Sequence, residues 1–146
     1  MTEALTDRWM SEALREASKG LGTTSPNPAV GAVIVKHGRI IARGYHRAFG
    51  RPHAEVEELA RVRGQPAFLR HATMYVTLEP CDHFGKTPPC TRAILLSCLR
   101  HVVVGMLDPH GIVAGRGIRR LCQAGVRVDV LDDPSVSEFY EPYRTD

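Results

Sequence analysis

Apolar side chains recur at helical spacing near the start of the chain. Across residues 7–18 they return every three or four positions, which predicts an amphipathic helix with one face in a core. These positions are Trp9, Met10, Ala13, Leu14 and Ala17. Gly20 and Gly22 follow, and glycine favours the end of a helix.

Short runs rich in valine and isoleucine predict β-strands. The first two, residues 29–35 and 39–45, are separated by His37-Gly38, a pair typical of a hairpin turn. Three later runs, at residues 73–78, 101–106 and 126–131, predict further strands. We therefore expect an antiparallel hairpin in the first half of the chain and three more strands in the second half.

Helical segments alternate with the later strands. The pattern predicts helices over residues 53–63, 90–98 and 112–124, the second of them introduced by Pro88-Pro89. The acidic tail that starts at Asp132 predicts no defined element. Because strands that alternate with helices favour parallel pairing, the expected fold class is α/β. We expect a three-layer α-β-α sandwich around a mixed sheet of about five strands.

Length and composition agree with one globular domain. The chain has 146 residues, 43% of them hydrophobic, so we expect a single domain over residues 1–146. The longest apolar runs are too short to cross a bilayer, and the first residues lack the pattern of a secretory signal. These features predict a cytoplasmic protein with no membrane partner.

Charge distribution limits the expected partners. The formal net charge is +3, Arg119-Arg120 is the only adjacent basic pair, and aromatic residues make up 6% of the chain. Binding of nucleic acid favours a basic stripe and aromatic stacking positions, so we expect no nucleic-acid partner. The small positive excess suits a phosphorylated small molecule.

Three short segments carry residues that bind metal ions. They are Pro52-His53-Ala54-Glu55, Glu79-Pro80-Cys81 and Pro88-Pro89-Cys90. One imidazole and two thiolates form a typical ligand set for a catalytic zinc ion whose fourth position holds water. His53, Cys81 and Cys90 are therefore the candidate Zn²⁺ ligands. Cys98 and Cys122 stand in apolar helical contexts, where we expect core residues.

Glu55 is the candidate catalytic residue. Zinc lowers the pKa of a bound water to roughly 7, and a neighbouring carboxylate can take that proton and pass it on. The alternative is a structural zinc module, in which His83, Cys98 or His110 would supply a fourth ligand. A structural site predicts that Glu55→Ala changes stability alone.

The order of these motifs resembles that of a known family, the cytidine-deaminase-like zinc deaminases, in which His-x-Glu precedes Pro-Cys. Eight residues separate Cys81 from Cys90, a longer insert than the Pro-Cys-x-x-Cys of nucleoside and RNA-editing deaminases. Together with residues 24–35, 44–46 and 77–81, the insert is similar to the pyrimidine deaminases of bacterial riboflavin biosynthesis. The resemblance extends from Trp9 to Val130, nearly the whole chain.

The resemblance implies a substrate and a reaction. The substrate would be a diaminopyrimidinone that carries a ribosylamino 5′-phosphate, and hydrolysis of its 2-amino group would give a dione and ammonia. The implied substrate contacts are Asn27, His46, His83 and Lys86. An asparagine amide both donates and accepts hydrogen bonds at a ring edge, and a lysine ammonium binds phosphate as a point charge.

The chain also departs from the family pattern. Asp108-Pro109-His110-Gly111 stands where Asp-Pro-Asn-Pro is typical, and Asp82 stands where serine is common. The alternative is therefore a related deaminase that acts on another aminopyrimidine, a pterin or a nucleobase in secondary metabolism. Bacterial relatives usually carry a fused reductase; here we expect no nicotinamide binding, and either a separate reductase protein or an excised domain. Because relatives commonly form dimers or tetramers, the resemblance also admits a homo-oligomer.

Overall fold

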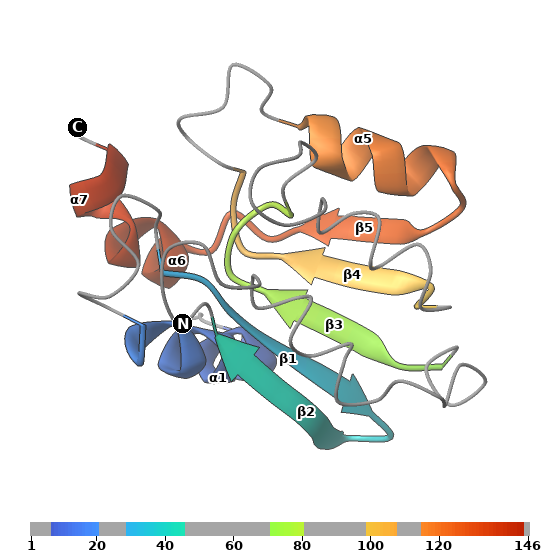
Figure 1. Cartoon of the computed structure of the whole chain (residues 1–146), viewed down its shortest axis with the longest axis horizontal. Helices are drawn as coiled ribbons and strands as arrows, with labels where there is room; N and C mark the ends of the chain where they lie inside the picture. The colour runs from blue at the N-terminus through green and yellow to red at the C-terminus, as the bar shows by residue number, and fades with distance from the viewer. Residues whose placement is uncertain (1–6, 21–28, 46–70, 81–98, 108–114, 145–146) are drawn as a thin grey trace.

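The computed structural model describes residues 7–20, 29–45, 71–80, 99–107 and 115–144. The elements in chain order are α1 (Arg8–Ser18), β1 (Gly31–Lys36), β2 (Arg39–Tyr45), β3 (Thr73–Val76), β4 (His101–Val104), α5 (Arg116–Gln123), β5 (Arg127–Val130), α6 (Pro134–Phe139) and α7 (Glu141–Arg144) (Figure 1). The helices predicted over residues 53–63 and 90–98 lie outside the described residues.

The strands form one mixed sheet. Five strands are arranged in the order β2-β1-β3-β4-β5. β1 pairs antiparallel with both β2 and β3, whereas β3, β4 and β5 are parallel to one another. The hairpin turns at His37 and Gly38, whose φ angles of 53° and 74° are the two positive values that a type I′ turn needs. The predicted hairpin and the predicted parallel portion are both confirmed.

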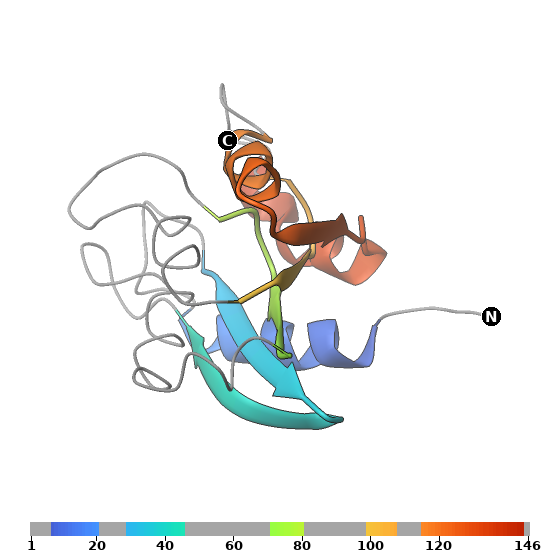
Figure 2. The ribbon, with the colours of Figure 1, turned by 90° about the vertical axis from the view of Figure 1, so that its right-hand side faces the viewer.

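Helices cover both faces of the sheet. One core includes residues of α1 and α6: Met10, Ala13, Val33, Val35, Leu78, Val103, Met106, Val136 and Tyr140. The other includes α5: Ala32, Ile34, Ala42, Met74, Val76, Val102, Val104, Leu121 and Val126. Figure 2 shows α1 and α6 on the same side of the strands. Neighbouring strand residues alternate between the two cores, as expected of a sheet buried on both faces, and the three-layer fold class is confirmed.

The backbones of α1 and β1 meet at Gly31. A Cβ atom placed on Gly31 would lie 2.1 Å from the carbonyl oxygen of Ala13 and 2.4 Å from the amide nitrogen of Ala17. These distances leave no room for a side chain, so glycine permits the close approach of the helix. α1 itself begins where the Asp7 carboxylate accepts hydrogen bonds from the backbone N–H groups of its first turn, at 2.8 and 3.0 Å.

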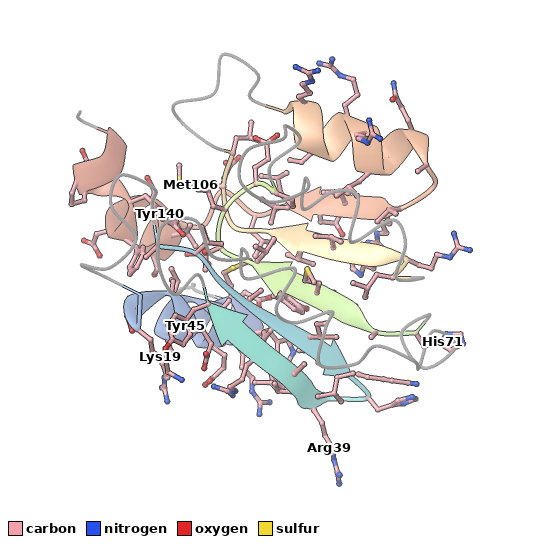
Figure 3. All side chains as sticks on the ribbon, in the orientation of Figure 1. Lys19, Arg39, Tyr45, His71, Met106 and Tyr140 are labelled. Atoms are coloured by element: carbon pink, nitrogen blue, oxygen red, sulfur yellow. The ribbon has the colours of Figure 1, made fainter. Side chains whose placement is uncertain are left out.

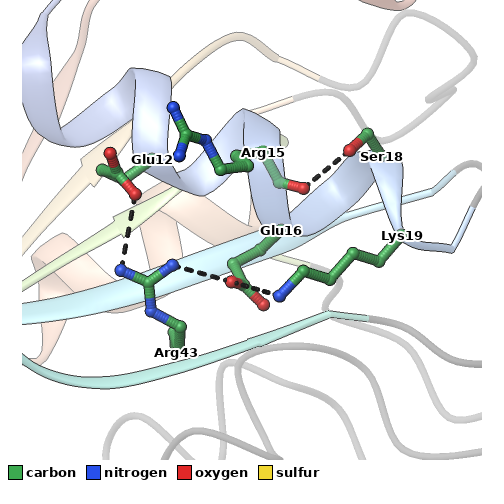
Figure 4. Close-up of polar contacts among 6 residues, drawn as sticks. All are labelled: Glu12, Arg15, Glu16, Ser18, Lys19 and Arg43. Atoms are coloured by element: carbon green, nitrogen blue, oxygen red, sulfur yellow. Dashed lines mark hydrogen bonds and ion pairs between the residues drawn. The ribbon is translucent and has the colours of Figure 1, made fainter.

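A charged cluster joins α1 to the edge strand β2. Glu16 is only 2% exposed, and its Oε2 accepts hydrogen bonds from Arg43 Nη1 and Lys19 Nζ, each at 2.9 Å (Figure 4). Arg43 Nη2 lies 3.4 Å from Glu12 Oε1. The hydrogen bond to Glu16 is the largest of the causes that raise the pKa of Arg43. The buried carboxylate is thus paired with two cations, as burial of a charge requires.

Several elements begin or end at other residues than predicted, among them β3, β4 and α5. β3 and β4 end at Val76 and Val104, because the chain then leaves the regular ladder for irregular backbone hydrogen bonds, such as Glu79 N–H to Met106 O at 3.0 Å. α5 begins at Arg116 rather than at residue 112, because Gly115 is its N-cap and has a φ angle of 84°. Residues 112–114 of the predicted helix lie outside the described residues.

The tail forms helices that the sequence pattern did not predict. Asp133 accepts a hydrogen bond from Ser135 N–H at 2.8 Å, and Pro134 opens α6, a favourable pair for a helix start. Cys122 is exposed, which corrects its expected core position: α5 buries Leu121, and the next residue points away from the sheet. Cys98 lies outside the described residues. None of the helices in the described ranges has the length and apolar character needed to cross a bilayer.

Candidate active site

The strand register brings several chain segments to one end of the sheet. Tyr45, the last residue of β2, pairs with Gly31, the first residue of β1. Val76, the last residue of β3, pairs with Val104, the last residue of β4. The end of β2, the start of β1 and the ends of β3 and β4 therefore lie side by side.

We define the carboxyl end of the sheet as residues 29–31, 45, 77–80 and 105–107. Figure 3 shows Tyr45 and Met106 at this end, with Tyr140 beside them, and shows Arg39 and His71 at the opposite end. In sheets with parallel strands, ligands bind outside the carboxyl ends of the strands, so this end is the expected place for a site.

The predicted site residues themselves all lie outside the described residues: Asn27, His46, His53, Glu55, Cys81, His83, Lys86 and Cys90. Three of them adjoin the carboxyl end through the chain. Asn27 stands two residues before Ala29, His46 follows Tyr45, and Cys81 follows Pro80. The convergence of all eight residues on this end stays a prediction.

A buried chain of hydrogen bonds braces the carboxyl end. The Tyr140 hydroxyl donates to Ala29 O at 2.6 Å, Thr77 Oγ1 lies 2.6 Å from the same hydroxyl, and Gly31 N–H donates to Thr77 Oγ1 at 3.2 Å. A hydroxyl has one proton, and that of Tyr140 goes to Ala29, so Thr77 donates to Tyr140. The four groups form a one-way chain that ties the residue after α6 to the start of β1.

Glu79 is a buried carboxylate at the same end, with an exposed fraction of 8%. Its Oε1 accepts a hydrogen bond from Gly115 N–H at 3.0 Å, and its Oε2 accepts one from Gly117 N–H at 3.1 Å. Its own backbone N–H donates to Met106 O. Glu79 therefore connects the exits of β3 and β4 with the first turn of α5, two residues before Cys81.

Sequence reasoning missed these bracing residues. Thr77 and Glu79 belong to the segment that leads to Cys81, and that proximity was the available signal, but it does not say which groups they bind. Nothing in the acidic tail pointed to Tyr140, because its hydrogen-bond partners lie far away in the sequence.

Metal binding rests on the chemistry of the predicted donors. Within the described ranges, no group of three or more histidine, cysteine, aspartate or glutamate side chains could hold a metal ion, and all three predicted ligands fall outside those ranges. An imidazole with two thiolates suits zinc, whereas magnesium and calcium take oxygen ligands. The donor set of His53, Cys81 and Cys90 therefore fits a zinc ion.

Comparison with known proteins defines the class. The family described as the cytidine and deoxycytidylate deaminase zinc-binding region matches residues 4–106. The chain therefore belongs to this family of zinc-binding deaminases. A structure of RibD from Acinetobacter baumannii (form 1) has a TM-score of 0.87 and 40% identity, and covers 94% of this chain and 38% of that chain.

Relatives of the chain include proteins of riboflavin biosynthesis. The riboflavin biosynthesis protein RibD of Aquifex aeolicus is 50% identical over 130 residues, which are 89% of this chain and 36% of that protein. The diaminohydroxyphosphoribosylamino-pyrimidine deaminase of Buchnera aphidicola is 43% identical over 122 residues, which are 84% of this chain and 81% of that protein. The chain thus spans little more than a third of the RibD proteins and most of the Buchnera protein. The resemblance deduced from the motif spacing is confirmed.

Proposed function

We propose that the chain is a zinc-dependent pyrimidine deaminase of riboflavin biosynthesis. Its substrate is a diaminopyrimidinone with a ribosylamino 5′-phosphate, whose 2-amino group is replaced by oxygen with release of ammonia. The similarity to the Buchnera aphidicola deaminase carries the proposal, because it extends over 81% of that protein. That relative is therefore similar almost throughout, and its name describes this deamination.

The chemistry is divided among the chain's own residues. His53, Cys81 and Cys90 would hold zinc, which supplies a Lewis acid that activates water near neutral pH. The Glu55 carboxylate accepts a proton from the water that attacks the ring carbon. It then delivers that proton to a ring nitrogen. Next it takes the proton of the newly formed hydroxyl group and passes it to the amino group, which leaves as ammonia while the C–O bond becomes a carbonyl. Water thus provides the new oxygen, and no oxidant or reductant is needed.

Four polar residues are proposed to bind the substrate. Asn27 and His46 adjoin the carboxyl end of the sheet through Ala29 and Tyr45, which supports a role at the pyrimidine ring. His83 and Lys86 follow Cys81 in the same insert, and the lysine ammonium is suited to the 5′-phosphate.

The experiment is an ammonia-release assay with the zinc-loaded full chain. The panel contains the phosphorylated diaminopyrimidinone, its dephosphorylated riboside, a free aminopyrimidine, a pterin and deoxycytidine monophosphate. We expect the highest kcat/KM with the phosphorylated diaminopyrimidinone. A higher value with the pterin or the free aminopyrimidine would replace the proposal by the related deaminase of secondary metabolism.

Glu55→Ala tests the catalytic residue. We expect this variant to keep its zinc and its fold and to lose at least about a hundredfold in kcat, because general acid–base catalysis is worth that much or more. Glu57→Ala is the matched control, since it removes a carboxylate from the same segment without touching the His-x-Glu motif. Zinc content by atomic absorption and thermal unfolding accompany the kinetics. Retained turnover in Glu55→Ala would instead favour a structural zinc module.

A further inference from the structure

Glu79 joins three parts of the described structure at the carboxyl end of the sheet. It lies just after β3, its backbone N–H binds Met106 O after β4, and its carboxylate binds Gly115 N–H at the start of α5. We propose that Glu79 is a positioning residue of the active site, which fixes the exit of β3, two residues before Cys81, against the exit of β4 and the first turn of α5. The inference rests on the proposed function, because it concerns the zinc and substrate of that same site.

The Glu79 carboxylate, which comes from the segment after β3, caps the N-terminus of α5. The N-cap of α5 is Gly115, which has no side chain to cap with, and the first turn of α5 contains no acidic residue. The first N–H groups of a helix have no partner within it, and a negative charge beside them is favourable. Glu79 supplies both the acceptors and the charge, through Gly115 and Gly117.

Chain connectivity extends this contact to the metal ligand. Cys81 is two residues beyond Glu79, a span of at most about 7 Å. Because only Pro80 separates Glu79 from Cys81, we expect a shift of the Glu79 backbone to be passed on to the metal ligand. A side chain fixed at two oxygens and one backbone N–H is well placed to restrict that movement. Residues that orient metal ligands commonly tune metal affinity, although they do not touch the metal.

A substitution that removes the charge of Glu79 but keeps its size distinguishes a positioning role from a role in packing. Glu79→Gln keeps the shape of the side chain, but its NH₂ group faces an N–H donor where an acceptor stood. One of the two hydrogen bonds to α5 is therefore lost. Glu16→Gln is the matched control, because Glu16 is also a buried carboxylate, bound to Arg43 and Lys19 on the side of α1 that faces β2.

The experiment measures three quantities for the zinc-loaded full chain and for both variants. These are the rate of zinc transfer to a coloured chelator, the kcat and KM of ammonia release, and the midpoint of thermal unfolding. For Glu79→Gln we expect zinc loss to be roughly tenfold faster, by analogy with other residues that orient ligands. We also expect KM to rise by a larger factor than kcat falls. Glu16→Gln should lower the unfolding midpoint and leave zinc transfer and KM unchanged.

Equal zinc transfer rates and equal KM values in the two variants would overturn the proposal and leave Glu79 a structural cap. If the unmodified chain releases no ammonia from any substrate, the proposed function fails, while the zinc transfer rates still decide the role of Glu79. If Glu79→Gln does not fold, Glu79→Asp takes its place. It keeps the charge on a shorter side chain, and should shift zinc transfer in the same direction.

Discussion

At the scale of single residues, Gly31 is a position where one added methyl group should matter. The nearest atoms to a Cβ at Gly31 belong to the backbone of α1, at 2.1 and 2.4 Å, so no side-chain rotation can relieve the contact. We expect Gly31→Ala to lower the free energy of unfolding by about 3 kcal/mol or more, the upper end for overpacking. Urea unfolding of the purified chain measures the change.

Gly38→Ala is the control for this prediction. Gly38 has a φ of 74° and no atom within 4 Å of its would-be Cβ, so its substitution tests backbone conformation without crowding. We expect a loss of about 1 kcal/mol there, the usual cost of a left-handed conformation in a residue with a side chain. Equal losses of unfolding free energy at both glycines would show that α1 shifts freely and that its close approach to β1 does not contribute to stability.

At the residue scale, the sequence was enough to predict the motif residues, but not the residues that hold the neighbouring backbone in place. His53, Glu55, Cys81 and Cys90 could be chosen because their residue types and order imply metal and proton chemistry. The role of Glu79 could not, because it depends on Gly115 and Gly117, which are 36 and 38 residues away. A carboxylate that binds backbone N–H groups leaves no pattern in the sequence, since any residue except proline supplies such a group.

At the scale of elements, the Tyr140 hydroxyl fixes the C-terminal helices to the sheet. Tyr140 is 2% exposed, and its hydroxyl stands between Thr77 Oγ1 and Ala29 O. We expect Tyr140→Phe and Thr77→Val each to cost about 1–3 kcal/mol, because each leaves a buried polar group without its partner. The double variant should cost less than the sum by about 1 kcal/mol, since the two hydroxyls share one hydrogen bond.

Urea unfolding of the four proteins of this cycle gives the coupling energy. Phe139→Leu is a suitable control, because it alters the aromatic residue next to Tyr140 and leaves the hydroxyl in place. Strict additivity of the two substitutions would mean that the hydroxyls of Thr77 and Tyr140 are not coupled. The hydrogen bond between them would then make no contribution to fixing the C-terminal helices.

The elements that could be predicted were those with a clear local signal in the sequence, such as a periodic apolar pattern or a turn motif. α1 has an apolar stripe and a capping Asp7, and the β1–β2 hairpin has His37-Gly38 at its turn, so local sequence determined both. α6 has only Val136 buried among its own residues, too few for a stripe. Its cap, Asp133-Pro134, was visible in the sequence but stood in a tail without periodicity. Its position depends on packing against residues far away in the chain.

At the scale of the whole molecule, the described part of the fold has two apolar cores, one on each face of the sheet. Both consist of residues outside the predicted zinc ligands, and α1, α5 and α6 all contribute to them. A structural zinc module differs, because its core is too small to fold without the metal. The size of these cores therefore predicts how the molecule responds when zinc is removed.

We expect the zinc-free chain to remain folded and to become less stable. An ion that binds only the folded state adds about 2.7 kcal/mol at a hundredfold excess over its dissociation constant, and that contribution disappears on chelation. Dialysis against a chelator should lower the thermal midpoint and leave the far-ultraviolet circular dichroism spectrum nearly unchanged. Cys81→Ser should give the same lowered midpoint without a chelator, and added zinc should no longer raise it. A cooperative loss of secondary structure on chelation would mean that the metal, rather than the two cores, holds the sheet together.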